Sequence, residues 1–257
     1  MVCVGETAQF KVVAGGGGLS YQWQYQKPGS SEWIDSTLTG AKTDALAVKG
    51  TVGRNGYQYR CVVTNAAGTA TSEPAALTVF AIKTQPVSVS AKEGDSVTFK
   101  VTATGSNLTY QWQYKAPGGS WKNSPASGNK TAKLTVPATV SRNDYQYRCI
   151  VTCGDQKITS SAATLTVFGI QTQPKDVTVS KGGTAVFKVV ATGENLTYQW
   201  QYKTPDGTWK NSPAAGNKTA TLTVPATASR NQYQYRCVIK NASGLSLISS
   251  AAKLTVK

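Results

Sequence analysis

The sequence predicts an all-β protein made of three tandem antiparallel β-sandwiches. The first observation behind this prediction is a long internal repeat. Tryptophans at positions 23, 112 and 200 and cysteines at positions 61, 149 and 237 recur with a period of 88 or 89 residues. The second is an alternation of apolar and polar residues, which is typical of strands with one buried face. A repeat this long exceeds the roughly 20–50 residues of solenoid units, so each copy is expected to close its own core.

The repeated motifs place the same residue types at the same points of each copy. Residues 108–115 and 196–203 both read LTYQWQYK, and the first copy keeps YQWQY at residues 21–25. Residues 121–126 and 209–214 both read WKNSPA. We therefore expect three domains, at residues 1–79, 80–167 and 168–257. The first is expected to be truncated at its N-terminus and to lack its first strand.

Each copy reads as a series of short strands separated by Gly, Pro, Asn and Ser. Val97, Phe99, Val101 and Ala103 point to one face of such a strand, and threonine and lysine point to the other. No stretch has the periodicity of an amphipathic helix. About seven strands per copy are expected to form a two-sheet sandwich.

Each copy resembles a domain of the immunoglobulin superfamily, and the resemblance covers essentially the whole chain. Trp112 stands where the family keeps its core tryptophan, and the motif Tyr147-Arg148-Cys149 matches the family's Tyr-x-Cys. More narrowly, the YQWQ, YRC and closing LTV motifs resemble the tandem immunoglobulin-like domains of large bacterial surface proteins, in particular those of Gram-positive anaerobes. The resemblance implies an elongated rod of sandwiches with these structural core residues: Trp23, Trp112, Trp200, Tyr59, Tyr147, Tyr235, Cys61, Cys149 and Cys237.

The cysteines depart from the family pattern. Where the resemblance implies a second core cysteine, the three copies have valine. The core cysteines therefore have no partner within their own domains and are expected to be free thiols that pack as small apolar side chains. The valines in question are Val12, Val101 and Val189.

Two cysteines, Cys3 and Cys153, lie outside the repeated motif. Cys153 stands where the other copies have Asn65 and Asn241, in what is expected to be a turn between two strands. Cys153 is therefore expected to be exposed.

The junctions between copies contain no spacer rich in Gly, Ser or Pro. The next copy begins directly after the closing strand of the previous one, with Phe80 and Ile82 at the first junction. We expect these apolar residues to pack between neighbouring domains and to hold the array in a semi-rigid rod. Because the last copy stops at the end of its closing strand, the chain is expected to be a piece of a longer array.

Composition argues against several functions. The chain contains no histidine, which is the commonest general base and the commonest metal ligand. No apolar run is long enough to cross a membrane. No catalytic constellation or metal-ligand cluster recurs between copies, so neither enzymatic activity nor a cofactor is expected.

The net charge of +15 is distributed unevenly. Residues 1–79 carry +1, residues 80–167 carry +6, and residues 168–257 carry +8. A positive field attracts anionic polymers such as nucleic acid, teichoic acid or acidic glycans. The basic residues are dispersed, so a solvated surface that keeps the rod soluble explains the charge as well.

The outward side of two neighbouring strands is the candidate ligand face. Glutamine, lysine and arginine side chains there offer hydrogen-bond donors for hydroxyl, carboxylate or sulfate groups. A solvated sheet face has the same composition, so a purely structural role is the alternative. The second tryptophan of each copy either covers the sandwich edge or presents its ring to a sugar. The candidate residues are Gln111, Gln113, Lys115, Gln146, Arg148, Gln199, Gln201, Lys203, Gln234, Arg236, Trp121 and Trp209.

These observations predict a binding or spacer array and not an enzyme. The leading hypothesis is a stalk segment of a bacterial extracellular or cell-surface protein, acting as a spacer alone or also as an adhesin. The expected partners are anionic glycans, cell-wall polymers or host surface proteins, together with neighbouring domains of the same chain. No specific nucleic acid and no membrane insertion are expected. The alternatives are a carbohydrate-binding accessory region of a secreted polysaccharide-degrading enzyme and a structural or decoration module of a phage.

Overall fold

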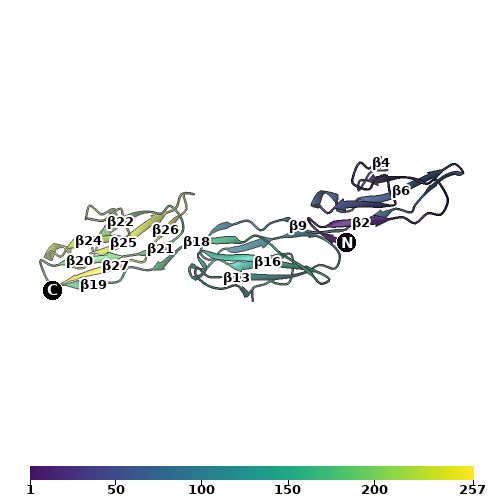
Figure 1. Cartoon of the computed structure of the whole chain (residues 1–257). Coiled ribbons are helices and arrows are strands. Elements are labelled where there is room, and N and C mark those ends of the chain that lie inside the picture. Colours follow the sequence, from purple (N-terminus) through teal and green to yellow (C-terminus); the bar gives the residue numbers. More distant parts are fainter.

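The computed structural model describes residues 1–257 and shows three β-sandwiches one after another in an elongated chain (Figure 1). Each sandwich encloses its own cluster of buried apolar side chains. The helical elements are three short 3₁₀ turns, one in each sandwich. The all-β fold predicted from the alternating pattern is therefore confirmed.

The second and third domains contain the same strands in the same order, and the first domain contains fewer. The first domain contains β1 (Val2–Cys3), β2 (Thr7–Lys11), β3 (Ser20–Gln26), β4 (Ile34–Asp35), β5 (Ala45–Lys49), the turn η1 (Val52–Arg54), β6 (Gln58–Asn65), β7 (Gly68–Thr71) and β8 (Ala75–Ala76). The second contains β9 (Val79–Thr84), β10 (Val89–Lys92), β11 (Ser96–Lys100), β12 (Thr102–Thr104), β13 (Thr109–Lys115), β14 (Lys122–Asn123), β15 (Lys133–Pro137), η2 (Val140–Arg142), β16 (Tyr145–Cys153) and β17 (Gln156–Thr159). Strand β18 (Ala163–Thr172) runs into the third domain, which contains β19 (Val177–Val179), β20 (Thr184–Lys188), β21 (Val190–Thr192), β22 (Thr197–Lys203), β23 (Lys210–Asn211), β24 (Thr221–Pro225), η3 (Ala228–Arg230), β25 (Gln234–Lys240), β26 (Ser246–Ile248) and β27 (Ala252–Val256).

Two sheets face each other in each domain. In the second domain one sheet has the order β10-β18-β16-β13-β14, and the other pairs β11 with β15 and β12 with β9. The third domain repeats this arrangement with the order β19-β27-β25-β22-β23, together with the pairs β20–β24 and β21–β18. Neighbouring strands are antiparallel except for one parallel pair in each domain: β1 with β9, β10 with β18, and β19 with β27.

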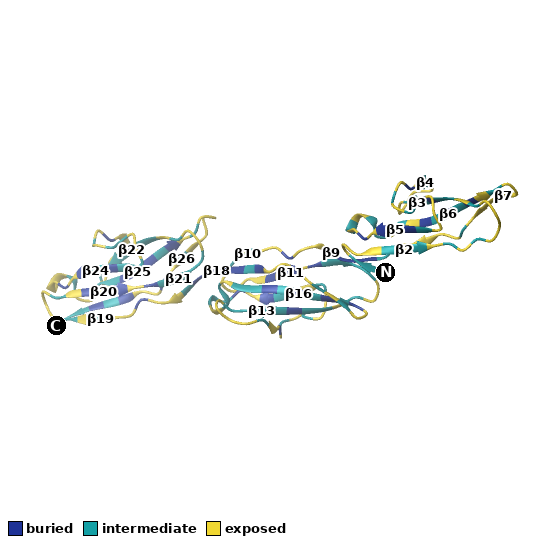
Figure 2. Ribbon diagram, in the orientation of Figure 1, coloured by how far each residue is buried: buried dark blue, intermediate teal, exposed yellow.

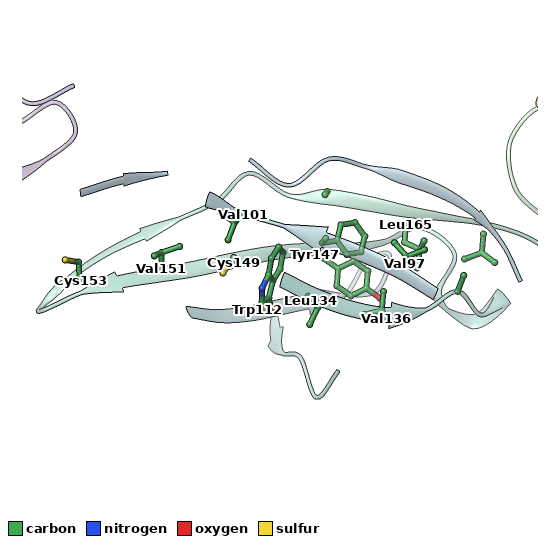
Figure 3. Packing of buried hydrophobic residues seen from close by; sticks show 14 of the residues in the cluster. Val97, Val101, Trp112, Leu134, Val136, Tyr147, Cys149, Val151, Cys153 and Leu165 are labelled. Atoms are coloured by element: carbon green, nitrogen blue, oxygen red, sulfur yellow. The ribbon is translucent and has the colours of Figure 1, made fainter. Parts of the chain in front are cut away.

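The core of each sandwich is built around the tryptophan of the YQWQY motif. Trp112 on β13 lies opposite Cys149 on β16, and both side chains are fully buried between the sheets (Figure 3). The Trp112 indole Nε1 donates a hydrogen bond to the Thr131 carbonyl oxygen at 2.9 Å, so the one polar atom of the ring is satisfied. Phe99 packs against Tyr147 with ring centroids 4.7 Å apart. Equivalent residues of the other domains are also buried: Trp23, Trp200, Tyr59, Tyr235, Cys61 and Cys237.

The first junction is a single continuous strand, β9. Side chains of a strand alternate between its two sides. Val79 and Ala81 join the core of the first domain, and Phe80 joins the core of the second, with Ile82 packed against it. Figure 2 shows β9 as mostly buried where the two sandwiches meet. The prediction that Phe80 and Ile82 lie between the domains was wrong: both belong to the second core, because the strand continues into that sandwich.

The second junction has the same construction in β18. Leu165 and Val167 belong to the second core, whereas Phe168 belongs to the third and Ile170 packs against it. The strand pairs with β10 and β16 before the junction and with β21 after it. Backbone hydrogen bonds therefore pass from one domain to the next without a linker.

The fifth cysteine also differs from expectation. Cys153 is 1% exposed, although its place in the repeat predicted an exposed turn. The reason is the length of β16, which carries Cys149, Val151 and Cys153 inward as alternate residues. Its sulfur lies 3.2 Å from the Met1 Sδ and 3.0 Å from the Ser106 carbonyl oxygen. Residue 153 thus packs at the first junction.

Candidate functional site

The candidate face lies on strands β13, β14 and β16. Cross-strand pairing places Gln113 opposite Arg148 and Lys115 opposite Gln146. The short strand β14 then adds Asn123 beside Gln113. The alternation of these strands turns their aromatic residues toward the core, so the polar residues share the outer side.

Trp121 and Arg148 form the centre of this face. The Arg148 guanidinium lies 4.2 Å from the centroid of the Trp121 ring, and the Lys115 ammonium lies 5.2 Å from the same ring. The Arg148 Nε donates a hydrogen bond to the Gln113 Oε1 at 3.0 Å, and the Gln113 Nε2 donates to the Asn123 Oδ1 at 3.2 Å. The side chains thus form one chain of contacts across three strands.

The third domain repeats the arrangement closely. The Arg236 guanidinium lies 4.2 Å from the Trp209 ring, and the Lys203 ammonium lies 5.5 Å from it. The Arg236 Nε donates to Gln201 at 2.9 Å, and Gln201 donates to Asn211 at 3.3 Å. The same residues at the same positions of the sandwich therefore give the same geometry in both domains.

The first domain has the same central arginine–tryptophan contact but different residues around it. The Arg60 guanidinium lies 4.1 Å from the Trp33 ring and donates from Nε to Gln24 at 2.9 Å. Gln24 donates to Asp35, a carboxylate where the other domains have an amide. Gln26 stands at the place of Lys115, so the face is less positive in this domain.

Not every predicted residue joins the cluster. The Gln111 side chain donates to the neighbouring Trp112 carbonyl oxygen at 2.9 Å, and Gln199 donates to the Trp200 carbonyl oxygen at 2.7 Å. These two amides are therefore used by the backbone. Gln146 and its equivalent, Gln234, lie across from the lysines at the end of the ladder.

The asparagines of the cluster, Asn123 and Asn211, were missed by the sequence reasoning. Their signal was the WKNSPA motif, which places an asparagine two residues after the second tryptophan in both later copies.

The contacts of this cluster stabilise the sheet whether or not a ligand binds. A guanidinium stacked on tryptophan contributes roughly 0.5–1 kcal/mol at an exposed site. Each arginine uses one ring contact and one hydrogen bond from Nε, which leaves its two terminal nitrogens without a hydrogen-bond partner in the chain. The face can therefore donate to an anionic group, but only through the edge of a guanidinium that is already held in place.

The core thiols have low reactivity. Burial raises the pKa of the Cys149 and Cys237 thiols to about 12, which keeps them protonated and poorly nucleophilic. All five cysteines are free in this structure. No group of three or more acidic, cysteine or histidine residues is placed to hold a metal ion.

Comparison with known families identifies the architecture. Residues 168–256 match the immunoglobulin I-set domain. The second sandwich has the same sheet order, and both other sandwiches have the same buried Trp, Tyr and Cys. The chain consists of immunoglobulin-like domains in tandem. No helix of the immunoglobulin-like array is both long and apolar enough to span a membrane.

Several relatives contain matching segments. Endoglucanase C of Cellulomonas fimi is 34% identical over 166 residues, which is 62% of this chain and 15% of the relative. Protein sax-3 of Caenorhabditis elegans is 27% identical over 224 residues, 77% of this chain and 17% of the relative. A three-domain immunoglobulin segment of titin has 17% identity and a TM-score of 0.43, with 100% of this chain and 94% of that chain covered. The chain thus spans less than a fifth of the length of these two curated relatives.

The relatives support the broader part of the resemblance. They include animal immunoglobulin-domain proteins as well as one bacterial protein, so the narrower type from Gram-positive anaerobes is not shown.

Proposed function

We propose that this segment is a non-enzymatic spacer of an extracellular protein, which holds the parts at its two ends apart. The observation that carries this proposal is the continuity of β9 and β18 through the two junctions. A spacer must resist bending, and a strand that is hydrogen-bonded in both domains has no free dihedral angles at the boundary.

The packing of the junction strands supports the same role. Each strand sends alternate side chains into two cores, so bending at the boundary would pull apolar residues out of one of them. Exposing a buried phenylalanine or valine costs about 1.5–3 kcal/mol. This cost favours one relative orientation of neighbouring domains.

The proposal also includes an adhesive role for this segment. The positive charge of the second and third domains favours partners such as anionic glycans, cell-wall polymers or acidic surface proteins. A bacterial cell-surface location rests on the YQWQ and YRC motifs. An accessory region of a polysaccharide-degrading enzyme is the less favoured alternative; the matching segment is 15% of the relative named as an endoglucanase.

Small-angle X-ray scattering tests the spacer. A strand of about 10 residues covers roughly 33 Å, so three sandwiches end to end should give a maximum dimension near 100 Å or more. A variant with six Gly/Ser residues inserted between Val167 and Phe168 should give a broader distance distribution, because each core keeps its own residues but the shared strand is interrupted. The control carries the same insertion in the exposed turn between Gly118 and Gly119 and should scatter like the native chain. A native chain as flexible as the junction variant would contradict the proposal.

A further inference from the structure

A groove opens at the edge of the second sandwich, where the connection between β14 and β15 crosses from one sheet to the other. It has a volume of about 560 Å³ and is lined by Tyr114, Tyr145 and Tyr147, by prolines and small hydroxyl residues, and by Arg142. The third domain has an equivalent groove of about 520 Å³. Both lie within the roughly 300–1,000 Å³ range of small-ligand sites. Neither includes the Arg148–Trp121 cluster, which is on the outer side of the sheet.

The most informative group in the groove is a phenol without a partner. Tyr147 is 2% exposed and lines the groove, yet its hydroxyl makes no hydrogen bond with any residue of the chain. In related sandwiches the equivalent hydroxyl commonly binds the backbone nearby. The hydroxyl oxygen keeps contact with solvent at the groove, so it is available to a molecule that enters there. Burial raises the pKa of Tyr147 to about 12, which keeps it a hydrogen-bond donor at neutral pH.

Arg142 adds positive charge beside this phenol. Its Nη1 donates to the Pro137 carbonyl oxygen at 2.9 Å, which fixes the side chain and leaves Nε and Nη2 without a partner in the chain. The guanidinium is close enough to lower the pKa of Tyr147 against the larger effect of burial. No acidic residue lines the groove. Two fixed donors, one of them charged, favour an anionic oxygen such as a carboxylate.

The walls suit a ring-shaped ligand. The rings of Tyr114 and Tyr145 are nearly parallel, with centroids 6.0 Å apart and an angle of 11° between their planes. Ser124, Ser127 and Ser141 bring hydroxyl groups to the same groove. Aromatic surface combined with several hydroxyl partners is a lining that accepts the apolar face and the hydroxyl groups of a sugar ring.

We propose that the grooves of the second and third domains each bind one unit of an acidic saccharide. Its carboxylate accepts hydrogen bonds from the phenol and the guanidinium, and its ring lies against the tyrosines. The residues equivalent to Tyr147 and Arg142 in the third domain are Tyr235 and Arg230, and Tyr202 and Tyr233 stack there at 9°. This inference rests on the adhesive part of the proposed function and is independent of the spacer role, because a flexible array would bind equally at each groove.

The first domain provides an internal contrast. Its groove has the same phenol and guanidinium, Tyr59 and Arg54, but its volume of about 310 Å³ is at the lower limit for small-ligand sites and well below the volumes of the other two grooves. Leu38 lines it at the place where the second and third domains have Ala126 and Ala214. The larger side chain occupies space that a sugar ring would need. Binding is therefore assigned to the two later domains, and two sites on one chain raise the apparent affinity for a polymer that reaches both.

Calorimetric titration of the whole chain with tetragalacturonate tests the inference, at about 0.15 M salt so that exposed charges are screened. The double variant Tyr147→Phe with Tyr235→Phe should bind about five- to tenfold more weakly, because each site loses one donor. Its unfolding transition should be unchanged, since the hydroxyls have no protein partner. The matched control is Lys100→Ser with Lys188→Ser, which removes two exposed charges outside both the groove and the outer face and should change the affinity by less than about twofold. A further variant, Arg148→Ser with Arg236→Ser, measures any contribution of the outer face. Methyl-esterified tetragalacturonate, which lacks the negative charge, should bind at least about tenfold more weakly than the acid.

Three results would overturn the inference. One is unchanged affinity in the phenylalanine variant. Another is equal binding of the acid and its methyl ester. The third is a larger loss for Arg148→Ser with Arg236→Ser than for the phenylalanine variant, which would place the ligand on the outer face.

Discussion

The two junctions are made of the same kind of strand, yet they differ at one buried position. At the first junction Ala81 is buried and joins the core of the preceding domain. At the second, Gly169 takes its place, and a methyl group there would lie 2.5 Å from the Val140 Cγ2 and 3.0 Å from a Glu93 carboxylate oxygen. The strand continues through both junctions, so its backbone hydrogen bonds connect the domains whichever residue is present. The size of the residue at this position determines how closely the neighbouring loops approach the strand.

The largest expected effect tests which domain's core contains the phenylalanine at each junction. Phe80→Ala should destabilise the second domain, and Phe168→Ala the third, each by about 3–5 kcal/mol through loss of a buried ring. Hydrogen exchange followed by mass spectrometry resolves the protection of each domain. Faster exchange in the preceding domain, with the following one unchanged, would reverse the assignment of the two faces of the strand.

A smaller effect should distinguish the two junctions from each other. Gly169→Ala should cost about 1–3 kcal/mol because the new methyl group meets a packed neighbour. The added substitution Val140→Ala should restore much of the loss, and alanine already stands at the equivalent position 228 of the third domain. The matched change Ala81→Gly should lower the free energy of unfolding by roughly 1 kcal/mol. The reason is different, because glycine makes the unfolded chain more flexible. Urea unfolding measures all three, and a neutral Gly169→Ala would mean that the loop yields freely.

The smallest effect concerns thiol reactivity, which only the first junction offers. Burial, helped by Glu6 and Cys153, raises the pKa of Cys3 above its ordinary 9.0, so its thiolate forms at higher pH than in an unfolded chain. Stability from this group is complete below pH 9 and falls as the pH rises above it, because the unfolded state then loses the proton first. Cys3 is nevertheless half-buried while Cys149 and Cys237 are fully buried with a pKa of about 12. Iodoacetamide at pH 8.5 should label Cys3 first, and mass spectrometry that finds either core cysteine labelled as fast would contradict this order.

Much of the fold could be predicted because its signals are local. The alternating pattern and the repeated motifs predicted strands and a sandwich for each copy, and the all-β fold is confirmed. The partition of Phe80 and Val79 between two cores could not be predicted, since an alternating strand has two faces and the sequence does not say which domain covers which. Cys153 was misplaced for a related reason: asparagine in the other copies suggested a turn, whereas β16 extends through residue 153.

The candidate site was predictable only in its residue types. The outward Gln, Lys and Arg side chains follow from alternation, and that they form a ligand face stays a prediction. The contact between Arg148 and Trp121 depends on where a two-residue strand places the tryptophan. The groove depends on residues from five separate segments whose approach no local pattern encodes.

The parallel strand pair in each domain has a mechanical consequence. Strand β10 lies near the entry of the chain into its domain, and its partner β18 leads out toward the next domain, with Val89 beside Leu165 and Lys92 beside Phe168. A pull on the two ends of the array drives these strands in opposite directions along their length. Their hydrogen bonds are then loaded together in shear instead of being peeled apart one by one. Under tension each domain should therefore hold its length until this pair gives way as a unit, and the array should extend in steps of one domain.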